Sequence, residues 1–472
     1  MLKWKIKNKN AGQILFVLYS CVLFIGTAIR IFDNAFWGDE CFTIRMAHLS
    51  LRDMFYATSV DVHPPLYYML VQVGYHLLGN HGYVYHLVSV IPLLITLLLC
   101  LTILQKRLGT VTAVLFATFS AVFPVAMVYN LEARMYSWAA LFVLLCFLKV
   151  ADILEKGRWS DYILFALYAV LAAYTHYYAM IAVAFFYLFL LVRVFFFQHA
   201  QIVRMLVACV GTVIAYLPWV IKFLLSFQRT AESWWLDSVP TVRDCGVFLF
   251  GNDALTIIFV VVLIVLLVCF GREGKQAEQQ WIGAGICAVA GLLLTGKMAS
   301  CLIRPLFITR YMYTAAPVAW LMFASGIGYV AKRISRNRSV IAGILISAAF
   351  ICGFAPEYVA QYKEEKSLDA ATAQFLEQVQ LPEHELILTD SGPHAWTILE
   401  YYYPTARIGE TYDMVSSINE NQSDCTVIVT SPLNEESCSK LSDIGFETEQ
   451  TYEGELGIRS MLYVYKVTHK EN

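Results

Sequence analysis

Apolar stretches about 20 residues long recur along most of this chain, and this repetition constrains the fold more than any other feature. A helix of that length crosses the hydrocarbon core of a bilayer, which is about 30 Å thick. With 58% hydrophobic and only 15% charged residues, the composition excludes a water-soluble globular protein, in which about a quarter of residues are charged. The sequence predicts an α-helical polytopic membrane protein with about eleven spans, near residues 13–32, 84–104, 110–130, 134–154, 160–178, 179–198, 202–221, 252–270, 281–297, 309–331 and 338–354.

The positions of the basic residues predict how the chain crosses the membrane, because Lys and Arg collect in short cytoplasmic connections. If the N-terminus is cytoplasmic, alternation of the spans places a basic cluster in every inner connection. These clusters are Lys3 to Lys9, Lys106-Arg107, Lys156 with Arg158, Arg193 to Arg204, Arg272 with Lys275, and Lys332 to Arg338. We therefore expect a multi-pass protein of the cell membrane with its N-terminus inside. The first span is expected to stay as an anchor, because no small-residue cleavage pattern follows it.

The charge of the chain changes near Pro356. Residues 1–360 hold 27 basic and 16 acidic residues, whereas the remainder holds 7 basic and 20 acidic ones. Such a shift marks a domain boundary, which divides the chain into a polytopic domain, 1–355, and a tail, 356–472. An odd number of spans places this tail outside the cell. The net charge of −2 does not favour a nucleic-acid partner.

The tail alternates helix-like and strand-like segments, which predicts a small extracytoplasmic α/β domain. We expect helices at 368–379, 393–402 and 435–444, and strands at 385–390, 426–430 and 463–467. The tail has no glycine-rich phosphate loop, so a capping or recognition role without chemistry is favoured. Cys425 and Cys438 could form a disulfide, although free thiols are the favoured alternative.

The connection between the first two spans, 33–82, is far longer than helix packing requires, and alternation places it outside. It starts with Trp37-Gly-Asp-Glu-Cys41 and ends with Asp61-Val-His-Pro-Pro-Leu-Tyr-Tyr68. Between them, residues 42–56 mix apolar and charged side chains and predict one amphipathic helix lying in the membrane interface. Such a helix would cover a site at the outer surface.

Other polar side chains gather at the same predicted level, at the ends of apolar spans. Ionisable residues there are costly, so each is a candidate functional residue. The alternative is that Tyr and Arg only anchor the spans at the interface. Their convergence on one predicted face favours function for the set, which comprises Glu132, Arg134, Tyr136, Thr175, His176, Tyr177, Lys297, Arg304, Arg310 and Tyr311.

The adjacent carboxylates Asp39 and Glu40, together with several cations, suit a reaction that needs a base and an anion-binding pocket. Glycosyl transfer from a phosphate-linked donor needs both. The alternative is that the two carboxylates only cap the loop helix. The inner connections are too short for a nucleotide-binding domain, so the donor is expected in the bilayer as a lipid-phosphate sugar.

Five motifs together resemble those of the GT-C membrane glycosyltransferases: Trp37-Gly-Asp-Glu, Asp61-Val-His-Pro-Pro-Leu-Tyr-Tyr, Glu132-Ala-Arg-Met-Tyr136, Thr175-His-Tyr-Tyr178 and Thr309-Arg-Tyr311. Over roughly residues 1–330, the chain is most similar to the bacterial branch that includes relatives of protein O-mannosyltransferases and of the lipid A aminoarabinose transferase. The resemblance implies a GT-C fold. Aminoarabinose-transferase-like sequences tend to carry Lys where this chain has His63. The resemblance therefore does not identify the sugar that is transferred.

The resemblance implies that Asp39 is the catalytic base, with Glu40 as its neighbour in the motif. From their charge, Arg134, Arg310 and Tyr311 are assigned to the donor phosphate. The acceptor or substrate is assigned to Asp61, His63, Tyr136 and His176.

The implied reaction is an inverting transfer from a polyprenyl-phosphate sugar to a hydroxyl of a lipid, glycan or protein. No cofactor is required, and a divalent cation held by Asp39, Asp61 and His63 is an open alternative. A hypothesis of another class is a transporter or flippase of lipid-linked glycans. The absence of a detectable internal repeat in the sequence disfavours it.

Overall fold

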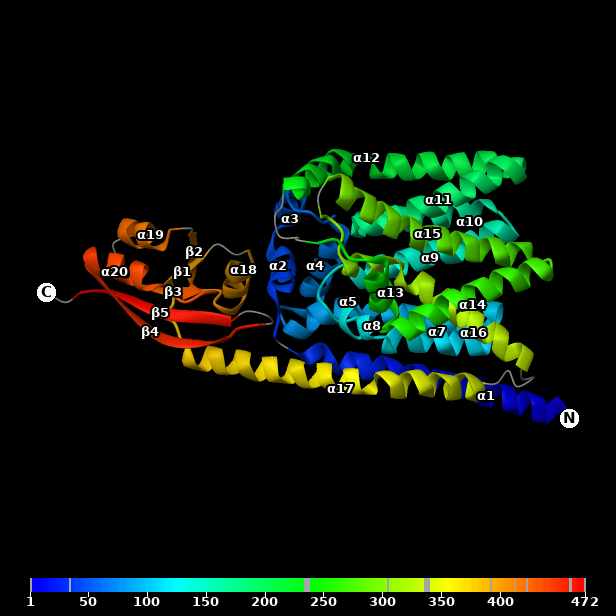
Figure 1. The fold of residues 1–472 in the computed structure, drawn as a ribbon, viewed down its shortest axis with the longest axis horizontal. Coiled ribbons are helices and arrows are strands. Elements are labelled where there is room, and N and C mark those ends of the chain that lie inside the picture. The colour runs from blue at the N-terminus through cyan, green and yellow to red at the C-terminus, as the bar shows by residue number, and fades with distance from the viewer. Residues whose placement is uncertain are drawn as a thin grey trace. The chain divides into compact units, whose positions relative to one another are not determined.

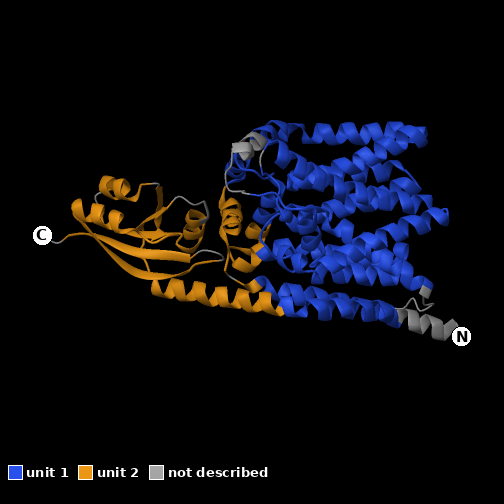
Figure 2. Cartoon of the chain, viewed as in Figure 1, with its two compact units in different colours: residues 1–31, 50–73, 86–358 blue, residues 32–49, 74–85, 359–472 orange. Residues whose placement is uncertain are grey.

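The structure is a computed structural model of the chain. It describes residues 2–33, 35–232, 238–303, 305–334, 340–390, 393–411, 413–421, 423–457 and 461–470. The chain divides into two compact units (Figure 2). Unit 1 consists of Met1–Ile31, Ser50–Val73 and His86–Tyr358, and unit 2 of Phe32–Leu49, Gly74–Tyr85 and Val359–Asn472. Each unit is described by itself.

Unit 1 is helical, and several of its helices extend beyond its limits (Figure 1). Its α-helices are α1 (Leu2–Ala28), α3 (Leu51–Val60), α4 (Leu66–Leu78), α5 (Gly82–Leu99), α6 (Gln105–Leu108), α7 (Thr110–Val122), α8 (Pro124–Tyr129), α9 (Tyr136–Glu155), α10 (Trp159–Thr175), α11 (Tyr177–Phe197), α12 (Ile202–Glu232), α13 (Val242–Phe250), α14 (Asp253–Arg272), α15 (Gln276–Leu302), α16 (Ala316–Ile334) and α17 (Val340–Gln378). Short 3₁₀ or π turns are η1 (Ile29–Phe32), η2 (Cys100–Leu104), η3 (His199–Gln201) and η4 (Thr309–Ala315).

Nine helical segments among the described residues are long and apolar enough to cross a membrane, and each coincides with a predicted span. The other two predicted spans form shorter helices. Residues 110–130 give α7 and α8, with Pro124 at the start of the second helix, and residues 160–178 give α10 of 17 residues. The polytopic helical class is therefore confirmed, and the count of eleven crossings stays a prediction.

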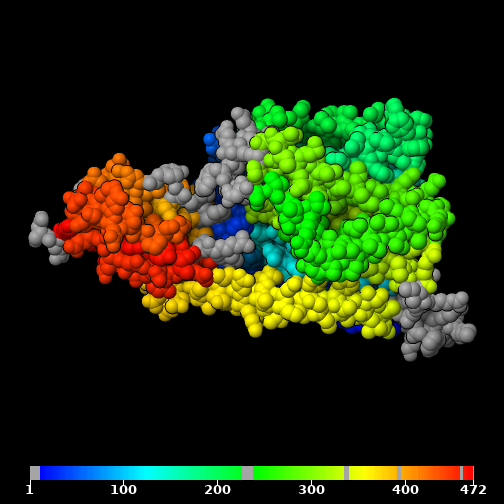
Figure 3. All heavy atoms as spheres, viewed as in Figure 1, coloured from blue at the N-terminus to red at the C-terminus, as the bar shows by residue number. Residues whose placement is uncertain are grey.

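The long helices of unit 1 differ in how much of their apolar surface is buried. In α9, 78% of the most apolar 18-residue stretch is buried inside the protein. In α14, only 17% of the corresponding stretch is buried. The green α14 lies on the outside of unit 1 (Figure 3), where it exposes Ile257, Ile258, Val260, Val261, Ile264, Val265 and Val268. A helix that is apolar all round and exposed is suited to contact lipid.

Unit 2 contains a five-stranded sheet with the order β2-β1-β3-β5-β4. The strands are β1 (Leu386–Asp390), β2 (Arg407–Thr411), β3 (Cys425–Val429), β4 (Phe446–Glu455) and β5 (Met461–His469). β1 pairs in parallel with β2 and β3, while β5 pairs antiparallel with β3 and β4. The helices are α2 (Gly38–His48), α18 (Pro393–Tyr402), α19 (Met414–Asn421) and α20 (Glu435–Asp443). The small C-terminal α/β fold is thus as predicted, and Cys425 and Cys438 are free thiols.

One helix prediction was wrong, and another gave a helix its wrong start. Residues 42–56 do not form one helix, because α2 ends at His48 and Ser50 caps a new helix, α3, by accepting the N–H of Asp53 at 3.2 Å. Residues 368–379 were predicted as a helix, and 368–378 are helical, but they are the end of the longer α17, which contains Pro356. The change in composition at this proline therefore falls inside a helix rather than in a linker.

Candidate functional site

Four segments far apart in the sequence converge in unit 1. Asp61 and His63 follow α3, Arg134 lies in the turn before α9, His176 separates α10 from α11, and η4 carries Arg310 with Tyr311. All these residues interrupt or end helices. The first pair does so because a residue before proline is disfavoured in the helical region and Pro64-Pro65 lacks backbone N–H donors.

His63 connects an acidic and a basic side chain. Its Nδ1 lies 3.4 Å from Oδ2 of Asp61 and 3.5 Å from Nη2 of the buried Arg134. Burial raises the pKa of Asp61, but the hydrogen bond and charge of His63, together with the charge of Arg134, outweigh burial and leave the pKa below its ordinary value. Asp61 is therefore a carboxylate in this site and balances part of its positive charge.

The lowered pKa of Asp61 predicts how stability depends on pH. A carboxyl group with a lowered pKa in the folded state stabilises the fold above its unfolded pKa, and this contribution is lost as the pH falls through the folded value. Asp61→Asn should therefore lower the unfolding temperature at pH 7 and leave a shallower loss of stability on acidification below pH 4. Thermal unfolding of both proteins in detergent between pH 3 and 7 measures this. Parallel curves for the two proteins would contradict the ion pair.

His176 presents a buried hydrogen-bond donor that no acceptor among the described residues satisfies. Its Nδ1 accepts the backbone N–H of Tyr178 at 3.1 Å, so the ring proton lies on Nε2. Neither that Nε2 nor the Oη of Tyr136 has a hydrogen-bond partner among the described residues, although the two residues are only 2% and 1% exposed. Their ring centroids lie 5.4 Å apart. Two buried polar groups without partners cost free energy, which is typical of groups that await a ligand.

Two aromatic rings lie near the guanidinium group of Arg310. Its Cζ lies 6.0 Å from the ring centroids of both Tyr136 and Tyr311, which is the outer limit of a cation–π contact. Tyr311 in turn stacks on Tyr178, with centroids 4.3 Å apart and ring planes 19° apart. We refer to Arg134, Tyr136, His176, Tyr178, Arg310 and Tyr311 as the arginine–aromatic cluster.

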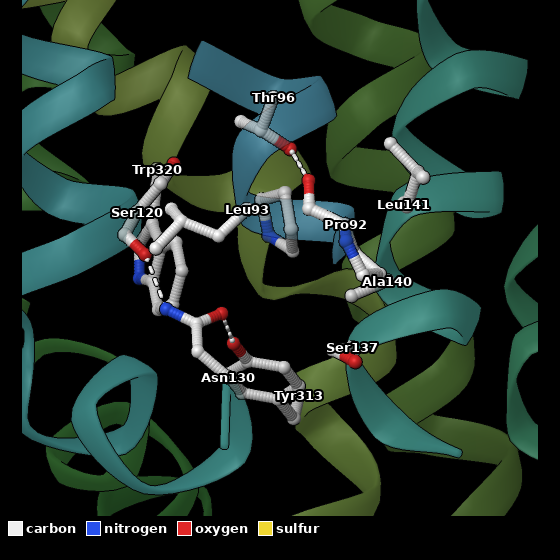
Figure 4. A pocket seen from close by; sticks show the side chains of 11 residues that line it. Pro92, Leu93, Thr96, Ser120, Asn130, Ser137, Ala140, Leu141, Tyr313 and Trp320 are labelled. Carbon is white, nitrogen blue, oxygen red and sulfur yellow. Dashed lines mark hydrogen bonds between the residues drawn. The ribbon is translucent and has the colours of Figure 1, made fainter. Parts of the chain in front are cut away.

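Asn130 connects the two segments that carry the arginines. Its Oδ1 accepts a hydrogen bond from the hydroxyl of Tyr313 at 3.0 Å, and its Nδ2 donates to the carbonyl of Ser120 at 2.8 Å (Figure 4). Asn130 lies just before the Arg134 turn, and Tyr313 belongs to η4 with Arg310. The same two side chains line a small pocket with Thr96, Ser137 and Trp320. This bond therefore joins the two basic segments.

Removing the hydrogen bond between Tyr313 and Asn130 should lower the stability of unit 1. Tyr313→Phe leaves the buried Oδ1 of Asn130 without its donor, which is expected to cost about 1–3 kcal/mol in the free energy of unfolding. Denaturant unfolding in detergent measures the loss. Asn130→Ala combined with Tyr313→Phe should cost less than the sum of the single changes, because the two side chains interact. Additive costs would contradict the coupling.

The two carboxylates Asp39 and Glu40 differ in burial within unit 2. Both lie in the first turn of α2. Glu40 is 2% exposed, and its Oε2 accepts the backbone N–H of Trp37 at 3.3 Å, so it caps the helix. Asp39 is half-buried. The capping role thus falls to Glu40.

The structure brings together seven of the nine predicted site residues in unit 1: Asp61, His63, Arg134, Tyr136, His176, Arg310 and Tyr311. Asp39 and Glu40 belong to unit 2 (Figure 2). Lys297 donates to the carbonyl of Pro240 at 2.7 Å, and Arg304 lies outside the described residues. Over the part of the chain that the structure describes, no three His, Cys, Asp or Glu side chains form a group that could hold a metal ion.

Sequence reasoning did not assign Asn130, Tyr178 or Tyr313 to the site. Tyr178 ends the Thr-His-Tyr-Tyr motif, and this position was the available signal. Asn130 was detectable only as a polar residue at the end of an apolar stretch. Tyr313 has no local signal, because tyrosine is common near the ends of membrane spans.

Comparisons with known proteins agree with this architecture. Residues 62–221 match the family described as dolichyl-phosphate-mannose-protein mannosyltransferase. The crystal structure of ArnT from Cupriavidus metallidurans in the apo state is similar over 96% of this chain and 97% of that one, with a TM-score of 0.60 and 12% identity. The ArnT structure bound to undecaprenyl phosphate covers the same shares, with a TM-score of 0.61 and 13% identity. No curated protein is similar enough to count as a match.

Proposed function

Since the chain is an integral membrane protein with the GT-C glycosyltransferase fold, we propose that it transfers a sugar from a polyprenyl-phosphate donor to an acceptor hydroxyl. The reaction takes place at the outer face of the cell membrane, with the N-terminus in the cytoplasm. The match over residues 62–221 supports a sugar transferase. That ArnT has been crystallised with undecaprenyl phosphate supports a lipid phosphate as the partner.

The observation that carries the proposal is the arginine–aromatic cluster. Arg134 and Arg310 supply positive charge for a phosphate, and Arg matches the geometry of phosphate oxygens through two parallel N–H donors. Nε2 of His176 and Oη of Tyr136 have no hydrogen-bond partner among the described residues. A phosphate-linked sugar offers acceptor oxygens to both groups. The exposed apolar helices allow the polyprenyl tail to remain in hydrocarbon.

The proposed step is a single displacement with inversion at the anomeric carbon. The acceptor oxygen forms a bond to this carbon as the bond from the carbon to the phosphate oxygen breaks. Asp39 takes the proton of the hydroxyl, and the electron pair of the broken bond leaves on the polyprenyl phosphate. Arg134 and Arg310 stabilise the negative charge that develops on this leaving group. Asp61 and His63 contact the acceptor.

Transfer by the purified full-length protein tests the proposal. Synthetic polyprenyl phosphates carrying different labelled sugars are supplied in turn, and release of polyprenyl phosphate is followed together with transfer to lipid, glycan and peptide acceptors. Water serves as a slow acceptor where the natural one is missing. We expect release with one class of sugar. Movement of labelled lipid across vesicle membranes without cleavage of any donor would instead favour the flippase.

A further inference from the structure

The C-terminal α/β domain and the Asp39 helix pack against each other inside unit 2. The Oγ1 of Thr397, in α18, donates to the carbonyl of Gly38 at 3.2 Å. The Oη of Tyr402, at the end of α18, accepts the backbone N–H of Phe36 at 3.1 Å. Both bonds reach main-chain groups within three residues of Asp39. The backbone that leads into α2 is therefore held by two side chains of the tail.

A second set of contacts holds α2 about two turns further along. The guanidinium of Arg45 lies 4.1 Å from the ring centroid of Trp396, and its Nε lies 3.4 Å from Oε2 of Glu400. These partners are four residues apart and lie on one face of α18. Because α2 is held near both ends, its rotation about its own axis is fixed relative to α18.

The segment before α2 has a third support in the tail. The N–H of Ala35 donates to Oδ1 of Asp369 at 2.9 Å. A Cβ atom at Gly457, where φ is +71°, would lie 2.1 Å from the carbonyl oxygen of Phe36. Only glycine fits there, both because of this close approach and because a positive φ disfavours other residues. The tail therefore contacts the chain at Ala35, Phe36 and Gly38.

From these contacts we infer that the C-terminal domain orients the Asp39 carboxylate for the proposed reaction, with Tyr402 and Thr397 as positioning residues. This inference rests on the proposed function. A general base must lie within hydrogen-bond reach of the proton that it removes, and a misplacement of about 1 Å can cost about 10²-fold in rate. The tail thereby affects the rate of the step that Asp39 carries out.

Two substitutions that remove the hydrogen bonds of Tyr402 to Phe36 and of Thr397 to Gly38 test the inference. Tyr402→Phe keeps the ring, and Thr397→Val keeps the shape of the side chain. Each should lower kcat about 10- to 100-fold with little change in KM for the donor, since the donor phosphate is assigned to unit 1. Thr397→Ser keeps a hydroxyl and should restore most of the rate.

Tyr403→Phe is the matched control. Tyr403 neighbours Tyr402, and its hydroxyl donates to the carbonyl of Val379 at 2.9 Å rather than to the segment around α2. We expect it to lose a similar increment of thermal stability while keeping the wild-type kcat. Equal losses of kcat in Tyr402→Phe and Tyr403→Phe, or no rescue by Thr397→Ser, would show general destabilisation and overturn the positioning role.

The outcome for Asp39→Asn separates the two proposals. If Asp39→Asn loses turnover while Tyr402→Phe and Thr397→Val keep the wild-type kcat, only the positioning role is overturned. If Asp39→Asn itself keeps the wild-type kcat, Asp39 is not the base and the proposed mechanism fails whatever the tail variants do. Thermal unfolding of each variant in detergent shows that the proteins compared are folded.

Discussion

Asp39→Asn is expected to lower kcat for sugar transfer by about 10²- to 10⁴-fold, the range typical of a lost general base. The amide cannot take the proton of the attacking hydroxyl, while its size and its position in the first turn of α2 are unchanged. Binding of the donor should be retained, since the phosphate is assigned to Arg134 and Arg310. Release of polyprenyl phosphate gives kcat, and titration with a labelled donor gives the dissociation constant.

Glu40→Gln is the control for this substitution. Glu40 caps α2 through the N–H of Trp37, and the amide oxygen of glutamine can still accept that bond. We therefore expect a small loss of thermal stability and near wild-type transfer. If Glu40→Gln abolishes transfer while Asp39→Asn does not, the roles of the two carboxylates are reversed.

Arg310→Met should lower kcat/KM for the donor by about 10²- to 10³-fold, the scale measured when one donor to a developing oxyanion is removed. Methionine keeps much of the apolar contact with Tyr136 and Tyr311 but carries no charge. Arg310→Lys restores the charge without the planar fork of the guanidinium, so it should recover only part of the loss. Steady-state kinetics with a varied donor concentration, and titration with polyprenyl phosphate, measure both effects.

Arg243→Gln is the control for a lost arginine. The side chain of Arg243 is 75% exposed and pairs with Asp253 at 2.6 Å, and such surface pairs contribute about 0–1 kcal/mol. Transfer by this variant should match the wild type. An unchanged affinity of Arg310→Met for polyprenyl phosphate would remove Arg310 from the donor site.

The strands of the tail show where local pattern is sufficient. β1, β3 and β5 lie inside the sheet and contain apolar runs, and each was predicted within a few residues. β2 and β4 were missed, and these are the two edge strands in the order β2-β1-β3-β5-β4. Most side chains of β4 are exposed or half-buried, so it carries little of the alternation that reveals a strand. The alternation of apolar and polar residues arises where one face of a strand is buried. Edge strands are buried least and therefore show it least.

For the membrane-spanning part, the sequence alone determined the class of the protein, because the cost of placing polar groups in hydrocarbon acts on each 20-residue window separately. It also singled out the polar residues at the ends of the helices. Their grouping was decided by tertiary packing. Local pattern does not reveal that Tyr178 stacks on Tyr311, or that the tautomer of His176 leaves Nε2 as the donor, because each depends on the position of another segment.

The position of Asp39 shows most clearly what tertiary contacts determine and local sequence does not. Its motif was recognisable from four consecutive residues, yet the backbone before it bonds to Asp369, which lies 334 residues further along the chain than Ala35. Periodicity and spacing report only interactions between near neighbours. Contacts across such a distance form when the packing of the whole unit repays the entropy of closing the loop, and this is why only the folded structure associates the Asp39 helix with the C-terminal domain.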